Sequence, residues 1–259
     1  IEEFYLNSPE NYLIYLFHKA TYNFARDYVI GKQVLDYGCG SGYGTHHIAT
    51  ACANIIGVDI AADAIEYAHA HYQAENLAYQ CIDPADQAPL PFADASFDTV
   101  LSFQVIEHIP DAISYLSEIH RLLKPGGVFI CATPDRSTRL LPRQKPWNIW
   151  HVHEYDAASL ACALAMFFPF PTLLRMGGRR DVLDIEISRT RRLMWLTLPV
   201  TLPFIPETIR IAALKLLRGL AGQKSKPAVL REFPFSEQDL VIATDVSPSV
   251  NLIAVAYKS

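Results

Sequence analysis

The chain has 259 residues, of which 51% are hydrophobic and 19% are charged, so it can bury the core of one large α/β domain and is short for two. Its five cysteines are odd in number and form no CxxC pair, which argues against a disulfide framework and against a structural zinc site. We therefore expect a single domain, residues 1–259, in the reducing setting of the cytoplasm.

The net charge of −5 conceals two oppositely charged parts of the chain. Residues 136–231 hold 16 Lys and Arg against 6 Asp and Glu, whereas the remainder holds 6 against 21. A clustered positive charge attracts acidic substrates, phosphates or anionic membrane surfaces. The same charge pattern also occurs on an ordinary solvated surface that binds none of these. The pattern favours an acidic small molecule or glycan as partner, and it leaves open a position at the inner face of the membrane.

Short apolar runs alternate with helical patterns in the first half of the chain, which predicts βαβ units and a parallel sheet. A helix is expected over 11–28, within an N-terminal helical flank of residues 1–31. Further helices are expected near 45–51, 62–73 and 111–123, the last with Asp111 as its N-cap. The expected strands are Gln33 to Asp36, Asn54 to Asp59, Leu77 to Ile82, Thr99 to Phe103 and Val128 to Ala132.

After the fifth strand, prolines interrupt the pattern until a helix begins near Asp156, and so long a loop is expected to be functional. Strands at Phe170 to Met176 and Asn251 to Tyr257 would complete a Rossmann-like, seven-stranded, mostly parallel sheet with helices on both faces. We place this core at 32–176 and 245–259. Residues 177–244 are expected to form an α-rich insertion that is basic and apolar, serving as a lid or facing a membrane.

Two stretches of the insertion bear on membrane contact. Leu193 to Pro206 is apolar, but three prolines make it too short and too interrupted to span a bilayer. Glu207 to Leu220 has an amphipathic, basic helical pattern, with Arg210 on the charged face. Such a helix packs over a substrate pocket or on another subunit, or it lies on an anionic membrane; in that last case we expect peripheral contact through 193–220.

The glycine-rich segment VLDYGCGSGYG, residues 34–44, reads as an apolar strand that ends in Asp36 and a turn that opens a helix. Glycines let the backbone approach a ligand closely. The dinucleotide fingerprint GxGxxG fails here, because its last position is Tyr43 when counted from Gly38 and Thr45 when counted from Gly40. An acidic residue before the turn suits a ligand with a cationic amino group and a sulfonium.

Two further acids end the next strands. Asp59 lies 19 positions after Gly40, where a carboxylate can accept both hydroxyls of a ribose. Asp83 ends the third strand and can accept from an adenine amino group, although a turn residue before Pro84 would fit equally well.

These stretches resemble the class I S-adenosylmethionine-dependent methyltransferases of the type 11 group, which includes bacterial ubiquinone, menaquinone and glycan methylases. The resemblance covers Gln33 to Asp135 and rests on the glycine segment, on GVDIAADAIEYA, on CIDPADQAPLPFADASFDTVLSFQVIEHIPD and on LSEIHRLLKPGGVFICATPD. It implies a methyltransferase of class EC 2.1.1.- that uses S-adenosyl-L-methionine and releases S-adenosyl-L-homocysteine. The cofactor-binding residues that it implies are Asp36, Tyr37, Gly38, Gly40 and Gly42 around the methionine part, Asp59 at the ribose, Ile60 and Ile82 at the adenine faces, Asp83 at the adenine amino group, and Ser102, Phe103 and Gln104 near the transferred methyl.

Methyl transfer to a hydroxyl requires removal of its proton, and histidine is the side chain whose ordinary pKa suits that task. The candidates are His108, in VIEH after the fourth strand, and His151, in WNIWHVHEY after the fifth. The second stretch is similar to the H-V-x-E-[YF] segment of many glycan methyltransferases, which makes His151 the leading base; His108 alternatively organises its loop. We expect no metal site, because HxHE lacks the i, i+4 spacing of helical ligands and no cysteine lies near it.

The sequence thus favours O-methylation of an acidic bacterial saccharide or lipid-linked glycan, with a histidine base, in polysaccharide biosynthesis. A C- or N-methyltransferase acting on a small apolar metabolite such as a quinone precursor is the first alternative. A non-catalytic cofactor-binding or membrane-docking module is the second. A nucleic-acid partner is not expected, because no recognised nucleic-acid module accompanies the basic segment.

Overall fold

The computed structural model describes residues 3–83, 89–220 and 233–259. Pro84 and residues 221–231 of the basic segment lie outside this part. The described residues form one mixed sheet of eight strands, in the order β3-β2-β1-β4-β5-β8-β6-β7. The strands are β1 (Gln33–Tyr37), β2 (Asn54–Asp59), β3 (Leu77–Cys81), β4 (Phe97–Phe103), β5 (Leu123–Pro134), β6 (Thr172–Gly178), β7 (Leu240–Ala243) and β8 (Asn251–Tyr257).

The first five strands pair in parallel, and their order turns back at β1 and β4, which are neighbours. Such a reversal leaves a crevice beyond the carboxyl ends of the strands, where α/β folds bind ligands. β8 lies antiparallel between β5 and β6. The expected Rossmann-like α/β fold is therefore confirmed.

The strand count differs from the expected seven. All seven expected strands are present, and β7 adds an eighth by pairing antiparallel with β6, from Arg175 opposite Ala243 to Gly178 opposite Leu240. β7 falls inside the segment that we expected to be an α-rich insertion. A run of only four apolar residues carries too little periodicity to indicate a strand, and it becomes one here because the open edge of β6 provides backbone partners.

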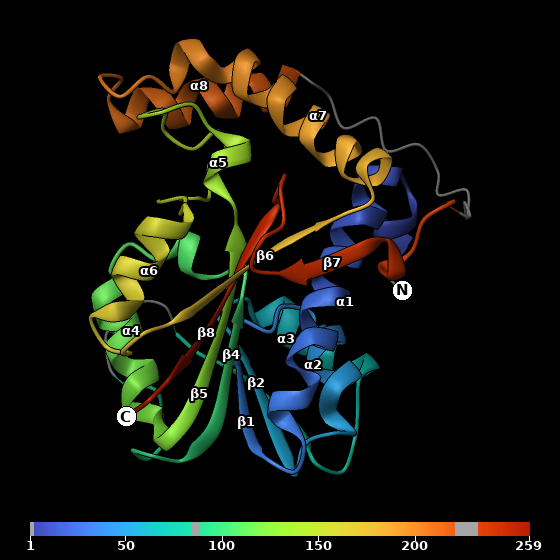
Figure 1. Cartoon of the computed structure of the whole chain (residues 1–259), viewed down its shortest axis with the longest axis vertical. Coiled ribbons are helices and arrows are strands. Elements are labelled where there is room, and N and C mark those ends of the chain that lie inside the picture. The colour runs from blue at the N-terminus through green and yellow to red at the C-terminus, as the bar shows by residue number, and fades with distance from the viewer. Residues whose placement is uncertain (1–2, 84–88, 221–232) are drawn as a thin grey trace.

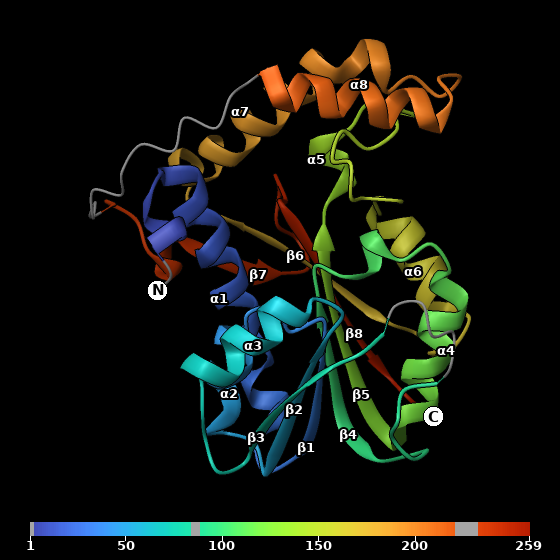
Figure 2. The ribbon, with the colours of Figure 1, turned by 180° about the vertical axis from the view of Figure 1, so that it is seen from behind.

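Helices cover both faces of the sheet (Figures 1 and 2). α1 (Pro9–Val29), α2 (Tyr43–Ala49) and α3 (Ala62–His71) lie on one face, and α4 (Ala112–Leu122) and α6 (Ala157–Ala165) lie on the other. Asp111 caps α4 as expected, because its carboxylate accepts from the backbone N–H groups of Ile113 and Ser114, both at 3.1 Å.

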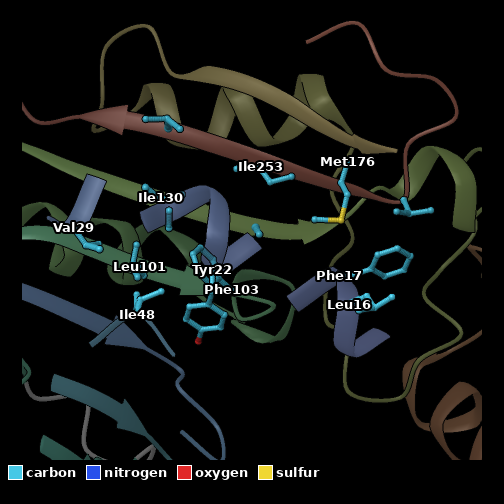
Figure 3. Packing of buried hydrophobic residues seen from close by; sticks show 14 of the residues in the cluster. Leu16, Phe17, Tyr22, Val29, Ile48, Leu101, Phe103, Ile130, Met176 and Ile253 are labelled. Carbon is cyan, nitrogen blue, oxygen red and sulfur yellow. The ribbon is translucent and has the colours of Figure 1, made fainter. Parts of the chain in front are cut away.

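The buried face of α1 packs across the middle of the sheet (Figure 3). Leu13, Leu16 and Phe17 recur at helical spacing and are at most 5% exposed. They belong to the same apolar cluster as Leu101 of β4 and Ile130 of β5. This packing carries the polar side chains of α1 to the carboxyl ends of the strands.

The segment after β6 forms an arch beyond the carboxyl ends of β4 and β5, built from α7 (Arg180–Thr197), a short 3-10 helix (Leu198–Val200) and α8 (Glu207–Leu220) (Figures 1 and 2). Within the part of the chain that the structure describes, no helix is long and apolar enough to cross a membrane. Arg210, which the sequence pattern places on the charged face of α8, is only 2% exposed. It donates to the carbonyl of Pro146 and to Glu207, which fastens α8 to the loop after β5.

Candidate active site

Gly38 and Gly40 of the glycine-rich turn after β1 both have a left-handed backbone, which glycine adopts easily and other residues rarely do. Gly38 has φ +83°, and a Cβ there would lie 2.3 Å from Cγ2 of Val105. Gly40 has φ +54°, and a Cβ there would meet no atom within 4 Å, so its Cα faces open space. The turn therefore packs tightly on one side and leaves its backbone accessible on the other.

Asp36 lies beneath this turn and is fully buried. Its Oδ2 accepts from the hydroxyls of Tyr22, at 2.9 Å, and Thr45, at 2.6 Å, whereas Oδ1 has no hydrogen-bond partner among the described residues. Burial raises the pKa of Asp36 to about 6, although the two hydroxyls oppose the shift. Instead of standing open to a ligand, Asp36 joins α1 and α2 to the end of β1.

Asp59, at the end of β2, is held by two backbone groups. Its Oδ2 accepts from the N–H of Gly40 at 2.8 Å, and its Oδ1 accepts from the N–H of Ala61 at 2.9 Å. Each carboxylate oxygen keeps a lone pair for another donor, so the side chain is oriented without being saturated. Two neighbouring hydroxyls, such as those of a ribose, fit this carboxylate.

A cavity of about 420 Å³, here called the larger cavity, opens beside the turn. Of the residues that the sequence singled out, it is lined by Tyr37, Gly38, Gly40, Asp59, Ile60, Ile82, Phe103, Gln104 and His108. Its lining does not include Asp36, Gly42, Asp83 or Ser102. Ser102 is buried between strands, where it donates to the carbonyl of Tyr37 at 3.0 Å and accepts from the hydroxyl of Tyr115 at 2.6 Å.

Residues 35–131 match a family model described as a methyltransferase domain. The chain is 38% identical over 143 residues to a probable S-adenosylmethionine-dependent methyltransferase of Mycolicibacterium smegmatis, covering 55% of this chain and 54% of that protein. It is 38% identical over 109 residues to a ubiquinone biosynthesis O-methyltransferase of Cereibacter sphaeroides, covering 42% and 44%. This chain carries a class I S-adenosylmethionine-dependent methyltransferase domain.

The same fold occurs in the crystal structure of an S-adenosylmethionine-dependent methyltransferase from Mesorhizobium loti, with a TM-score of 0.53 and 16% identity over 94% of this chain and 100% of that one. The present chain spans about half the length of the two curated relatives above. The methyltransferase domain thus accounts for residues 35–131 in sequence, and its fold for most of the chain.

A second cavity of about 260 Å³, here called the smaller cavity, adjoins the larger one. His18 and Gln104 line both cavities. His151 lines the smaller cavity and His108 the larger, and their ring centroids are 4.9 Å apart at an interplanar angle of 89°. The structure therefore brings the two sequence-predicted histidines together at the junction of the cavities.

His151 is oriented by a buried ion pair. Its Nδ1 lies 2.8 Å from Oε1 of Glu154, and Arg139 donates from Nε to the other carboxylate oxygen at 3.0 Å. Burial raises the pKa of Glu154, but Arg139 and His151 outweigh it and bring the value to about 2. Burial also lowers the pKa of His151, against the pull of Glu154. An ionised Glu154 can only accept a hydrogen bond. The neutral imidazole of His151 therefore carries its proton on Nδ1 and has its lone pair on Nε2.

Sequence reasoning missed several residues that line the two cavities. His18 of α1 has its Nδ1 2.7 Å from the hydroxyl of Tyr43, and burial lowers its pKa to about 4. Glu186 and Arg189 of α7 form an ion pair in the smaller cavity, with 2.7 Å between Oε1 of Glu186 and an Nη atom of Arg189. The i, i+4 spacing of His18 and Tyr22 on an aromatic helix was a usable signal, whereas nothing in the sequence connects α7 with His151.

Proposed function

We propose that this chain transfers the methyl group of S-adenosylmethionine, bound in the larger cavity, to a hydroxyl of an acceptor bound in the smaller cavity. The junction of the two cavities at His108 and His151 is the observation that carries the proposal. A methyl donor and a methyl acceptor held on either side of one junction need to move only a short distance to react. Positioning of this kind accounts for much of the rate acceleration.

The larger cavity fits the cofactor in chemistry as well as in position. Asp59 would receive the ribose hydroxyls, Ile60 and Ile82 would lie against the adenine, and the open side of Gly40 would admit the amino acid part. When bound, S-adenosylmethionine supplies an electrophilic methyl group on a positively charged sulfur. The buried carboxylate of Asp36 places negative charge beneath the turn, where it favours a cationic ligand.

His151 acts as the general base in this proposal. Nε2 of His151 takes the hydroxyl proton as the acceptor oxygen bonds to the methyl carbon and the C–S bond breaks, which leaves S-adenosylhomocysteine. Glu154 holds the imidazole in the required tautomer and stabilises the imidazolium that forms. Arg139 holds Glu154 in turn.

The smaller cavity favours an acceptor rich in hydroxyls. Its Arg139 contacts Glu154 and its Arg189 contacts Glu186, so the charges within it are largely paired. Hydrogen-bonding groups remain at Asn148 and at Trp147, whose buried indole N–H has no partner among the described residues. A saccharide hydroxyl suits such a lining, and an acidic group of the same acceptor would lie outward, near the basic arch.

Peripheral membrane contact through 193–220, at the inner face of the membrane, is a second part of this proposal. Trp195 and Leu196 of α7, Phe204 of the connecting loop and Leu216 of α8 are 60–75% exposed, and Lys215 beside Leu216 is exposed too. Exposed apolar and basic side chains on one segment are the composition that binds the surface of an anionic bilayer. A lipid-linked glycan would reach the smaller cavity from such a surface.

The test is release of S-adenosylhomocysteine by the purified chain with a panel of neutral saccharides, acidic saccharides, lipid-linked glycans and phenolic quinone precursors. We expect turnover with a hydroxyl-bearing saccharide, and a loss of about 10²–10⁴-fold in kcat on His151→Asn with cofactor affinity retained. His153→Asn, two residues away and outside the lining of both cavities, is the matched control. Turnover confined to quinone precursors would move the acceptor to the ubiquinone-type alternative, and cofactor binding without turnover on any acceptor would favour the non-catalytic module.

A further inference from the structure

Three side chains converge at the junction of the two cavities, and one of them is an unsatisfied buried carboxylate. Glu107 and His108 come from the short 3-10 helix Ile106–His108 after β4, and His151 comes from the loop after β5. Glu107 is fully buried; its Oε2 accepts from the hydroxyl of Thr133 at 2.9 Å, whereas Oε1 has no partner among the described residues. One ligand atom from each of the three residues lies within 4.8 Å of the other two.

The hydrogen bonds behind the two imidazoles determine what they present to this junction. Nδ1 of His108 lies 2.9 Å from the carbonyl oxygen of Trp150, which can only accept, so Nδ1 carries the proton. Nδ1 of His151 donates in the same way to Glu154, which is ion-paired with Arg139. Each ring therefore keeps a lone pair on Nε2. Metal-ligating histidines are typically held by such second contacts, from Nδ1–H to a carbonyl or a carboxylate.

Glu107 and His151 are buried, whereas His108 reaches the larger cavity and is not. Two imidazole lone pairs and one carboxylate oxygen are three acceptors with no donor among them, which is costly for the two buried groups unless a proton or a cation joins them. We propose that Glu107, His108 and His151 bind a divalent transition-metal cation of the Zn²⁺ or Co²⁺ type. Two imidazoles and one carboxylate favour these metals over Mg²⁺, which prefers oxygen ligands. Three protein ligands leave a coordination position open.

From the sequence we expected no metal site, because the ligand set that its spacing suggests is His151, His153 and Glu154. In the structure Glu154 contacts Nδ1 of His151 and His153 is not in the cluster, so those three do not form a ligand set. The ligands that do meet come from two loops that are distant in sequence, a pattern that spacing does not reveal. A cation here would occupy the nitrogen that takes the acceptor proton, so metal binding and base catalysis by His151 exclude each other.

The consequence for catalysis rests on the proposed function, but the binding itself does not, so the test uses the chain freed of metal with a chelator, without cofactor or acceptor. ZnCl₂ is titrated by calorimetry and CoCl₂ by its visible absorption, which reports nitrogen and oxygen ligands. We expect about one equivalent to bind, with binding weakened at least about 10-fold by Glu107→Gln and by His108→Asn. His153→Asn is the matched control and should bind as the unaltered chain does.

Several outcomes would overturn the site. These are the absence of binding, equal affinity in His108→Asn, loss of binding in His153→Asn, or MgCl₂ binding as tightly as ZnCl₂. If Glu107→Gln does not fold, His108→Asn decides the question. A chain that binds no Zn²⁺ yet methylates an acceptor refutes the cation site alone, whereas a chain that binds Zn²⁺ but no S-adenosylmethionine refutes the proposed function alone.

Discussion

The imidazoles of His108 and His151 meet edge to face with their centroids 4.9 Å apart, although one follows β4 and the other follows β5. β4 and β5 are neighbours in the sheet, so the loops that follow them emerge side by side at its carboxyl edge. The ring of His108 faces the larger cavity and that of His151 the smaller. The pair therefore lies where the two cavities adjoin, near His18 and Gln104, which line both.

Glu154→Gln should slow methyl transfer without weakening cofactor binding. A glutamine oxygen still accepts from Nδ1 of His151, but it neither carries the charge that stabilises the imidazolium nor pairs with Arg139. We expect kcat to fall about 10–100-fold and the melting temperature to drop, because Arg139 is left buried without a counter-charge. Steady-state kinetics together with thermal melting measure both effects. An unchanged kcat would mean that Glu154 does not position His151.

Asp59→Ala should weaken S-adenosylmethionine binding about 10–100-fold, since hydrogen bonds to a charged group contribute roughly 1.5–3 kcal/mol each. Calorimetric titration measures this, with NAD titrated in parallel. Asp63→Ala, on the exposed first turn of α3, is the control and should bind normally. Equal affinities in the two variants would mean that Asp59 does not contact the ligand.

Gly38→Ala and Gly40→Ala should fail in different ways. Alanine at Gly38 places a Cβ 2.3 Å from Val105 and strains a positive φ, so we expect a loss of about 2 kcal/mol or more of folding free energy. Alanine at Gly40 meets no protein atom but adds a methyl group toward the larger cavity, so cofactor affinity should fall with a smaller loss of stability. Urea unfolding and calorimetry separate the two. If Gly40→Ala bound the cofactor normally, the turn would not be the contact surface.

Asp36 should make stability depend on pH in a direction opposite to that of a surface carboxylate. Burial raises its pKa to about 6 from an ordinary 3.8, so the folded chain holds this proton more tightly than the unfolded chain. The resulting stability is fully present below about pH 3.8 and is lost as pH rises through 6, a change of about 3 kcal/mol. Asparagine does not titrate, so the folding stability of Asp36→Asn should rise relative to that of the unaltered chain between pH 5 and pH 8. A melting-temperature difference that stays constant over this range would contradict the assignment.

The exposed arch should bind anionic vesicles. In flotation assays with phosphatidylglycerol vesicles, we expect binding that falls with salt and is reduced several-fold by Trp195→Ser combined with Lys215→Glu. Ile113→Ser, an exposed apolar residue on α4 away from the arch, is the control. If both variants floated equally well, the arch would not be the surface that contacts the membrane.

The parts of the site that follow strand ends could be predicted from the sequence, because an apolar run marks a strand and its carboxyl end marks the ligand edge. Asp59 lines the larger cavity on that basis, whereas Ile60, Phe103 and Gln104, which also line it, follow from the resemblance to the methyltransferases. Contacts between elements could not be predicted. Whether Asp36 faces a ligand depends on Tyr22 of α1 and Thr45 of α2 closing over it, and those helices dock through apolar surface whose partner is not encoded locally.

α7 contributes side chains both to the smaller cavity and to the exposed surface of the arch. Glu186 and Arg189 face the smaller cavity, whereas Trp195 and Leu196 face solvent on the same helix, and the neighbouring helix α8 is fastened through Arg210 to the loop that carries Trp147. An acceptor anchored in a bilayer would thus travel along a single helix from the lipid surface to the reacting atoms. The search for the acceptor would then be confined to two dimensions, and the rate would depend on how much of the protein is docked as well as on how much acceptor the cell holds.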